Sequence, residues 1–176
     1  TFEKQGFEAD DIIATLAKRV KDAQVIIVSG DLDALSLVGE QIKVFALRKG
    51  IKNTVLYDLN LVREKYQGLI PEQLVDLRAL RGDASDNIPG VKGVGEKTAI
   101  RLLLDFGNLE NLYQELEKET EKAKVLPPRL KEILIKEKSG LFFLSLWLGF
   151  KLRLPLILTW NSAAGQNMIK KKPRAS

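Results

Sequence analysis

The sequence predicts an α/β fold with a parallel sheet in its first half, followed by a part built only from helices. Residues 25–29 form a nearly unbroken β-branched run, typical of a strand buried in a parallel sheet. Apolar residues at helical spacing flank this run on both sides. After a glycine-rich turn at residues 89–95, only helical patterns follow as far as residue 138. With 176 residues, 45% of them hydrophobic, the chain can form one domain or a domain with a subdomain.

Apolar spacing and capping residues place the elements of the first half. Apolar residues from Ala9 to Val20 recur at helical intervals, and Asp58 is a typical N-cap for a helix beginning at Leu59. We expect a helix at 9–20, a strand at 25–29, a short helix at 34–38, strands at 42–47 and 54–57 joined by a turn at 48–53, and a helix at 59–66.

The second half begins with a helix that Pro71 starts and that we expect to end near Leu80. Its arginines, Arg78 and Arg81, have two interpretations: contact with phosphate, or exposure to solvent. Beyond the glycine-rich turn we expect helices at 97–106, 109–116 and 129–138, with Gly107 ending the first and a charged, solvated segment at 117–124.

The character of the chain changes beyond Ser139. Residues 140–160 are unusually apolar, but Lys151, Arg153 and Pro155 interrupt them. This segment is too broken for a membrane span, which needs about twenty apolar residues. Residues 161–176 are polar, and we expect them to be disordered.

Composition excludes several kinds of site. The chain has no cysteine and no histidine, which excludes disulfides, thiolate or histidine zinc sites and Ser-His-Asp triads. A metal would therefore be held by oxygen, which favours Mg²⁺ or Mn²⁺. The net charge of +5 fits a polyanionic partner and fits ordinary solubility equally well.

Acidic residues gather in three segments: Glu8, Asp10 and Asp11, then Asp31 and Asp33, then Asp83 and Asp86. The middle pair follows the predicted strand at its carboxyl end, where α/β sheets place their sites. If the segments converge, two divalent ions about 4 Å apart could activate water and stabilise the leaving oxygen of a phosphodiester. The structural alternatives are a helix cap for the first group and a turn with an N-cap for the second.

The turn from Pro89 to Gly95 leads into a helix that carries Lys97. Glycine allows close backbone approach, and a helix start directs unpaired N–H groups outward. Those donors, with the positive end of the helix dipole, suit a phosphate. The sequence thus predicts metal-dependent chemistry beside a nucleic-acid backbone.

On these residues the chain resembles the 5′-nuclease family, and within it the 5′→3′ exonuclease domain of bacterial DNA polymerase I. The similarity covers about residues 1–138. The matching motifs are Gly6-Phe7-Glu8-Ala9-Asp10-Asp11, Val28-Ser29-Gly30-Asp31-Leu32-Asp33, and the run from Arg78-Ala79-Leu80-Arg81-Gly82-Asp83 through Lys97-Thr98-Ala99.

The resemblance implies an α/β fold with three parts. Residues 1–80 would be the C-terminal part of a PIN-like parallel-sheet nuclease core. Residues 81–138 would be an all-α helix-three-turn-helix subdomain that binds duplex DNA. Residues 139–176 would be a non-family tail, out of frame, disordered or poorly packed.

The resemblance also implies hydrolysis of DNA flaps and 5′ ends with two Mg²⁺ or Mn²⁺ ions. The acids shared most widely in the family match Glu8, Asp10, Asp31, Asp33 and Asp86, which would be catalytic and bind metal; Asp11 and Asp83 match further metal ligands. Duplex DNA would contact Gly90, Val91, Lys92, Gly93, Val94, Gly95, Lys97 and Thr98. A potassium ion would bridge the carbonyls of Val91 and Val94 to phosphate.

By the same resemblance, the partner would be duplex DNA with a 5′ flap or 5′ end, and the protein a monomer that acts in replication and repair in the bacterial cytoplasm, with no membrane partner. Whether a polymerase domain follows in the parent chain stays open. Two other classes also remain: a non-catalytic duplex-binding module with structural acids, and a toxin-like PIN ribonuclease, against which the glycine-rich turn argues.

Two departures from the family pattern bear on activity. The chain lacks the family's upstream segment, which carries further metal-site aspartates and basic arch residues, so we expect a fragment that is inactive alone. In the tail, reading residues 156–162 from the third base of each codon permits Asp-Phe-Asp-Leu-Glu-Gln, which favours an out-of-frame translation. The alternative for residues 141–158 is a membrane-associating or aggregation-prone segment.

Overall fold

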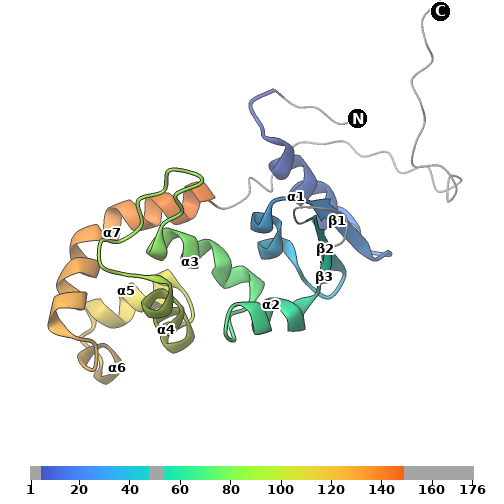
Figure 1. Ribbon diagram of the computed structural model, residues 1–176. Helices are drawn as coiled ribbons and strands as arrows, with labels where there is room; N and C mark the ends of the chain where they lie inside the picture. Colours follow the sequence, from blue (N-terminus) through green and yellow to red (C-terminus); the bar gives the residue numbers. More distant parts are fainter. Residues whose placement is uncertain (1–4, 48–53, 149–176) are drawn as a thin grey trace, which may run out of the picture.

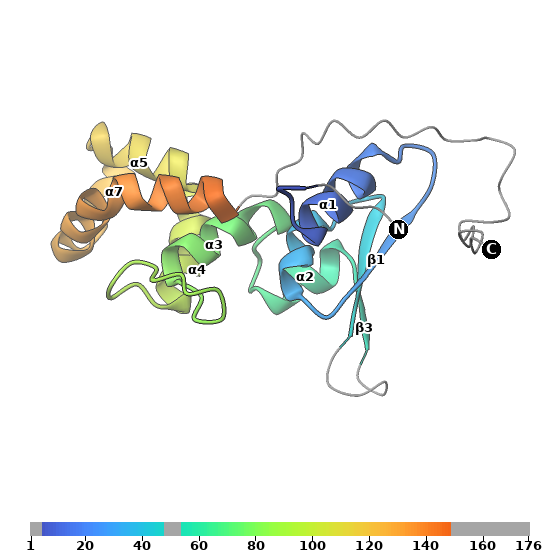
Figure 2. The same cartoon turned by 90° about the horizontal axis from the view of Figure 1, so that it is seen from above.

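The computed structural model describes residues 5–47 and 54–148. Figures 1 and 2 show a small sheet with its helices at one end of the molecule and a group of helices at the other. We call these the sheet unit and the helical unit. The expected turn at 48–53 and tail residues 149–176 lie outside the described residues.

Three strands form the sheet, in the order β1 (Val25–Ser29), β2 (Ile42–Ala46) and β3 (Val55–Tyr57). The expected parallel pairing is confirmed between β1 and β2, whereas β3 runs antiparallel to β2. The reason is the length of the connection. A parallel crossover needs a dozen or more residues, and residues 47–54 are too few for one.

The two faces of the sheet differ. Ile27, Val44 and Tyr57 form one cross-strand row, and all three are buried. The neighbouring row on the other face is more open, with Val28 at 59% exposure and Leu56 at 40%. The prediction that the β1 run is buried is therefore correct for one face only.

Helices cover the buried face and the strand ends. The elements of the sheet unit are α1 (Ala9–Arg19), the 3₁₀ helix η1 (Leu32–Leu37) and α2 (Leu59–Lys65). Asp58 caps α2 as expected, because its Oδ1 accepts a hydrogen bond from the Leu61 N–H at 2.9 Å.

The helical unit begins with the 3₁₀ turn η3 (Pro71–Gln73) and continues through α3 (Leu74–Arg81), α4 (Glu96–Phe106), α5 (Leu109–Glu117), α6 (Glu121–Lys124) and α7 (Pro128–Leu148). Helix α3 lies at the junction, in contact with η1 on one side and with α4 and α7 on the other. Its central leucines, Leu77 and Leu80, are buried in the core.

Helix α7 extends beyond the expected end at Lys138, because apolar residues that follow Lys138 pack against the other helices. Leu141 is buried, and Phe142 packs against Tyr113 with ring centroids 5.3 Å apart. The Ser145 hydroxyl donates to the Asp76 carboxylate at 2.7 Å. Leu141, Phe142 and Ser145 thus attach the end of α7 to the helical unit. Within the described part of the chain, no helix combines the length and apolarity needed to cross a membrane.

Candidate metal and nucleic-acid site

Two glycines close the loop that carries Asp83 and Asp86. Gly82 and Gly90 both have positive φ, and a Cβ on Gly90 would lie 2.3 Å from the Gly82 nitrogen. Between them, Asp83 and Ile88 exchange backbone hydrogen bonds of 2.9 and 2.8 Å. No side chain fits between backbones this close. We call residues 82–90 the clasp.

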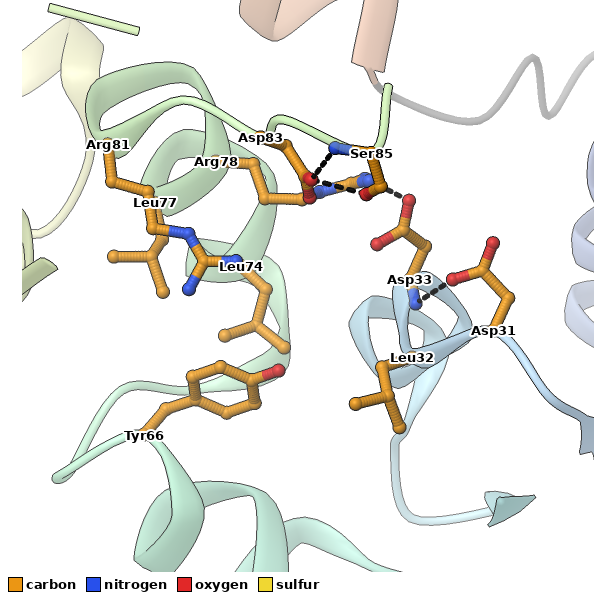
Figure 3. Close-up of a pocket in the computed structure, with 10 residues that line it drawn as sticks. All are labelled: Asp31, Leu32, Asp33, Tyr66, Leu74, Leu77, Arg78, Arg81, Asp83 and Ser85. Atoms are coloured by element: carbon orange, nitrogen blue, oxygen red, sulfur yellow. Dashed lines mark hydrogen bonds and ion pairs between the residues drawn. The ribbon is translucent and has the colours of Figure 1, made fainter. Parts of the chain in front are cut away.

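The clasp holds its two acids differently. Asp83 accepts hydrogen bonds from the hydroxyl and the backbone N–H of Ser85, and the hydroxyl bond is the main reason that the pKa of Asp83 is lowered. The Asp86 side chain is about half exposed. The Asp83 carboxylate lies at the pocket beside Arg78 (Figure 3), and Asp86 Oδ2 lies 3.8 Å from Arg78 Nη1.

The acids that follow β1 are ordered by local hydrogen bonds. The Ser29 hydroxyl accepts from the Asp31 N–H at 3.0 Å, and Asp31 Oδ1 accepts from the Asp33 N–H at 2.8 Å. Asp31 is thus the N-cap of η1, as the structural interpretation predicts. This capping directs the Asp33 carboxylate across the gap toward α3 (Figure 3).

Arg78 meets these carboxylates. Its side chain is only 8% exposed; it forms an ion pair with Asp33, and its Nη1 lies 3.8 Å from Asp86 Oδ2. Burial lowers the pKa of Arg78, while Asp86, Asp83 and Asp31 oppose that change. Of the two interpretations of Arg78, exposure to solvent is therefore wrong, and contact with phosphate stays a prediction. The spacing in the sequence could have indicated that Arg78 is buried, because it lies one helical turn after buried Leu74, on the apolar face of α3.

A pocket of about 300 Å³ opens between α3 and the end of β1 (Figure 3). Asp31 and Asp33 form one wall, and Asp83 and Ser85 lie along its rim. The opposite wall contains Leu74, Leu77, Arg81 and Tyr66, and burial raises the pKa of the Tyr66 hydroxyl. Sequence reasoning did not single out Tyr66 or Ser85, because only the tertiary fold brings them here.

The acids at the start of α1 have different surroundings. Glu8 and Asp11 form a capping box, in which Asp11 accepts from the Glu8 N–H at 3.3 Å. Their expected capping alternative is thus realised. Asp10 is not part of this capping box; burial, followed by the charges of Asp31, Glu8 and Asp11, raises its pKa. Asp10 therefore lies within the field of the acids at the end of β1.

The structure brings together part of the predicted acid set. Asp33 and Asp86 share Arg78, while Asp10 and Asp31 lie near each other. Carboxylate oxygen is the ligand that Mg²⁺ and Mn²⁺ prefer, so the donor chemistry fits a divalent ion. However, among the described residues no three acids converge closely enough to hold one. The arrangement is thus an acid cluster built around a guanidinium.

The glycine-rich turn exposes its backbone. Val91 and Val94 are buried and anchor the turn, whereas Lys92 and Gly93 between them are exposed. A Cβ on Gly93 or Gly95 would meet nothing within 4 Å. Gly95 is the N-cap of α4 and offers no side-chain cap to the first N–H groups of that helix. The predicted cradle for an anion is therefore open to the outside.

Comparison with known proteins identifies the same two units. The family model of the 5′-3′ exonuclease N-terminal resolvase-like domain matches residues 1–67. The model of the 5′-3′ exonuclease C-terminal SAM fold matches residues 69–168, beyond residue 138 where the motif resemblance ends.

Several curated relatives are bacterial DNA polymerases I. That of Chloroflexus aurantiacus is 49% identical over 120 residues, which are 66% of this chain and 13% of that protein. That of Bacillus subtilis is 47% identical over 133 residues, 74% of this chain and 15% of that protein. The chain thus spans about a seventh of the length of these relatives.

Solved structures of the bacteriophage T5 5′-exonuclease have the same fold. One with divalent metal ions (zinc) bound has a TM-score of 0.70 and 27% identity, and covers 84% of this chain and 52% of that one. A T5 flap endonuclease in a pseudo-enzyme–product complex with DNA and metal ions has a TM-score of 0.69, 26% identity and the same coverage. Since one family model alone spans more than half of the sequence, the chain belongs to the 5′→3′ exonuclease family.

Proposed function

We propose that the chain is part of a divalent-metal-dependent 5′→3′ exonuclease and flap endonuclease of the bacterial cytoplasm, which hydrolyses DNA phosphodiesters in replication and repair by a two-metal mechanism. One observation carries this proposal: Asp31 and Asp33 after β1 and Asp83 of the clasp line one pocket, and Arg81 of the same pocket pairs with Glu96 at the open start of α4. Family membership supports the same conclusion.

The proposed metal ligands come from three segments. Asp31, Asp33 and Asp86, with Glu8 and Asp10, would be the catalytic acids, and Asp11 and Asp83 would be additional ligands. Two bound Mg²⁺ or Mn²⁺ ions would supply an activated water and neutralise the leaving oxygen. The residues of this chain orient the ligands: Asp31 fixes the start of η1, and Ser85 fixes the Asp83 carboxylate. The divalent ions and DNA in the T5 structures support this proposal.

The proposed duplex contact is the turn before α4. Exposed Lys92 and Lys97 would meet phosphates, while the backbone of Gly93 and Gly95 allows close approach. The proposed interface comprises Gly90, Val91, Lys92, Gly93, Val94, Gly95, Lys97 and Thr98, with K⁺ at the carbonyls of Val91 and Val94. The Val91 carbonyl already accepts the Val94 N–H at 2.9 Å, so K⁺ would use its second lone pair.

A DNA-binding measurement tests the proposed duplex interface. Fluorescence anisotropy with a labelled 5′-flap duplex should show binding that weakens with salt, with a slope of about −0.9 per phosphate contact. Lys92→Ala with Lys97→Ala should lower the affinity and reduce that slope by about 2. Lys118→Ala, at the exposed end of α5, is the matched control. An unchanged slope in the double variant would place the interface elsewhere.

Cleavage and metal binding test the chemistry. With Mg²⁺, the 176-residue chain should bind the flap duplex but cleave it poorly, because no three acids among the described residues converge closely enough to hold a metal ion. Robust cleavage would refute that expectation. Asp31→Ala with Asp33→Ala should weaken Mn²⁺ binding.

The second candidate is a duplex-binding module with structural acids. It is favoured by one observation, the ion pairs of Asp33 and Asp86 with Arg78. Negligible Mn²⁺ binding, together with DNA affinity unaffected by Asp31→Ala and Asp33→Ala, would support the module instead.

A further inference from the structure

We propose that Arg78 is a built-in counter-cation of the acid cluster, a positioning residue that holds Asp33 and Asp86 together without metal and releases a carboxylate when divalent ions bind. This inference rests on the proposed metal function of the same acids. It adds an exchange between a side-chain cation and the metal.

Three separate parts of the chain meet at this guanidinium. Arg78 comes from α3, Asp33 from η1 and Asp86 from the clasp (Figure 3 shows the first two). One contact therefore joins the sheet unit to the helical unit. Among the described residues, Arg78 is the only basic group in ion-pair contact with Asp33 or Asp86, since nearby Arg81 pairs with Glu96 at 3.4 Å.

Burial makes this contact more than a surface ion pair. The Arg78 side chain is 8% exposed and that of Asp33 is 24% exposed, whereas Arg101 and Asp105 form a surface pair at 78% and 47%. Charges are poorly screened where water is scarce, so the buried guanidinium interacts more strongly with Asp33 than a surface arginine does with its partner. The guanidinium, whose charge is permanent, supplies a cation from within the fold.

The same oxygen cannot serve both cations well. Asp33 Oδ2 is directed at Arg78 Nη1, and a divalent ion coordinated by Asp33 and Asp86 would need the oxygens that now face the guanidinium. Each carboxylate keeps a second oxygen, so the competition arises where the ion takes Asp33 Oδ2 or Asp86 Oδ2. Metal binding through those oxygens requires Arg78 to withdraw from at least one carboxylate.

The decisive measurement is Mn²⁺ affinity, read from the electron paramagnetic resonance signal of free Mn²⁺. Arg78→Met removes the competing charge while keeping an apolar stem, so Mn²⁺ should bind about tenfold more tightly or better. Arg78→Lys keeps the charge and should stay within about threefold of the wild type. Arg101→Met removes a surface charge of the same kind and should change little.

Stability without metal provides the second readout. In EDTA, Arg78→Met should unfold at a lower temperature than the wild type, and Mn²⁺ should raise its Tm by more than it raises that of the wild type. If Arg78→Met fails to fold, guanidinium NMR of the wild type decides. Rotation about the Arg78 bonds should be hindered without metal and become fast when Mg²⁺ is added.

The outcomes separate this inference from the proposed function. Equal Mn²⁺ affinity of the wild type and Arg78→Met, or an Arg78 guanidinium unaffected by Mg²⁺, would overturn the exchange and leave the metal site standing. No Mn²⁺ binding by either protein would overturn the proposed metal function and the exchange with it. Binding by Arg78→Met alone would support both, with Arg78 as the dominant competitor.

Discussion

The exposed apolar side chains of the helical unit lie on different elements, such as Leu104 on α4 and Ile135 on α7, whereas the sheet unit leaves one face open. In the helical unit, Leu112 and Leu134 are completely buried, and the extension of α7 adds Leu141. In the sheet unit, Ile26 and Val28 are more than half exposed although they lie in a β-branched run. A run that is apolar on both faces is typical of a sheet covered on both faces. The comparison teaches that exposed apolar side chains gather on one face in the sheet unit and are dispersed over several elements in the helical unit.

The largest expected effect on stability is at the clasp, which belongs to the helical unit. Gly90→Ala should lower the free energy of unfolding by more than about 3 kcal/mol, because a Cβ would lie 2.3 Å from backbone at a φ of +62°. Gly93→Ala is the matched control. Its φ is +92° but its surroundings are open, so about 1 kcal/mol is expected. Equal losses in urea denaturation would show that the clasp is not tightly closed.

A pair of truncations sharpens the contrast between the two cores. Leu112→Ala should cost about 2–5 kcal/mol, because Leu112 is completely buried. Val28→Ala should change stability by about 0.5 kcal/mol or less, because Val28 is 59% exposed in this chain. Denaturation followed by circular dichroism measures both. A large loss for Val28→Ala would mean that the open face is covered in solution.

A substitution at the contact between α7 and α3 tests whether the end of α7 packs on the helical unit. Ser145→Ala should cost about 1 kcal/mol, because Asp76 loses one donor but keeps the Leu109 N–H at 3.0 Å. Ser139→Ala, on the exposed side of the same helix, should be nearly neutral. Equal effects on Tm would imply that residues 139–148 do not pack on α3.

The smallest effect is at Asp10, in the sheet unit. Its raised pKa means that folding favours the protonated form, so its contribution to stability is present below the unfolded pKa and is lost as pH rises through the folded pKa. Asp10→Asn should therefore raise the Tm at pH 7 without divalent ions by on the order of 1–2 °C, and leave it unchanged near pH 3. Exposed Asp22→Asn is the control. A lower Tm for Asp10→Asn at pH 7 would contradict the repulsion.

Local signals in the sequence predicted most of the fold. The β-branched run gave β1, the cap at Asp58 gave α2, and the glycines at 95 and 107 bounded α4. The sequence did not predict the open face of β1, the burial of Arg78 or the full length of α7. Each of these depends on what lies across from the residue in space, and spacing along the chain does not contain that information.

The acid site was predicted in part for the same reason. Segments with two or three acids are visible in the sequence, and so is their place after a strand. The ion pair of Arg78 with Asp33 joins residues that are 45 positions apart in the sequence, so no local pattern could predict it. Which acids cap a helix and which face the pocket was also decided by tertiary structure.

The clasp has a consequence for the order of folding. Its hydrogen bonds join Asp83 to Ile88, which are close neighbours along the chain, whereas the pair of Arg78 and Asp33 closes a much longer loop. Loop closure becomes entropically more costly with length, so the clasp can form early and the long-range pair later. We therefore expect the clasp to hold Asp83 and Asp86 before Arg78 pairs with Asp33.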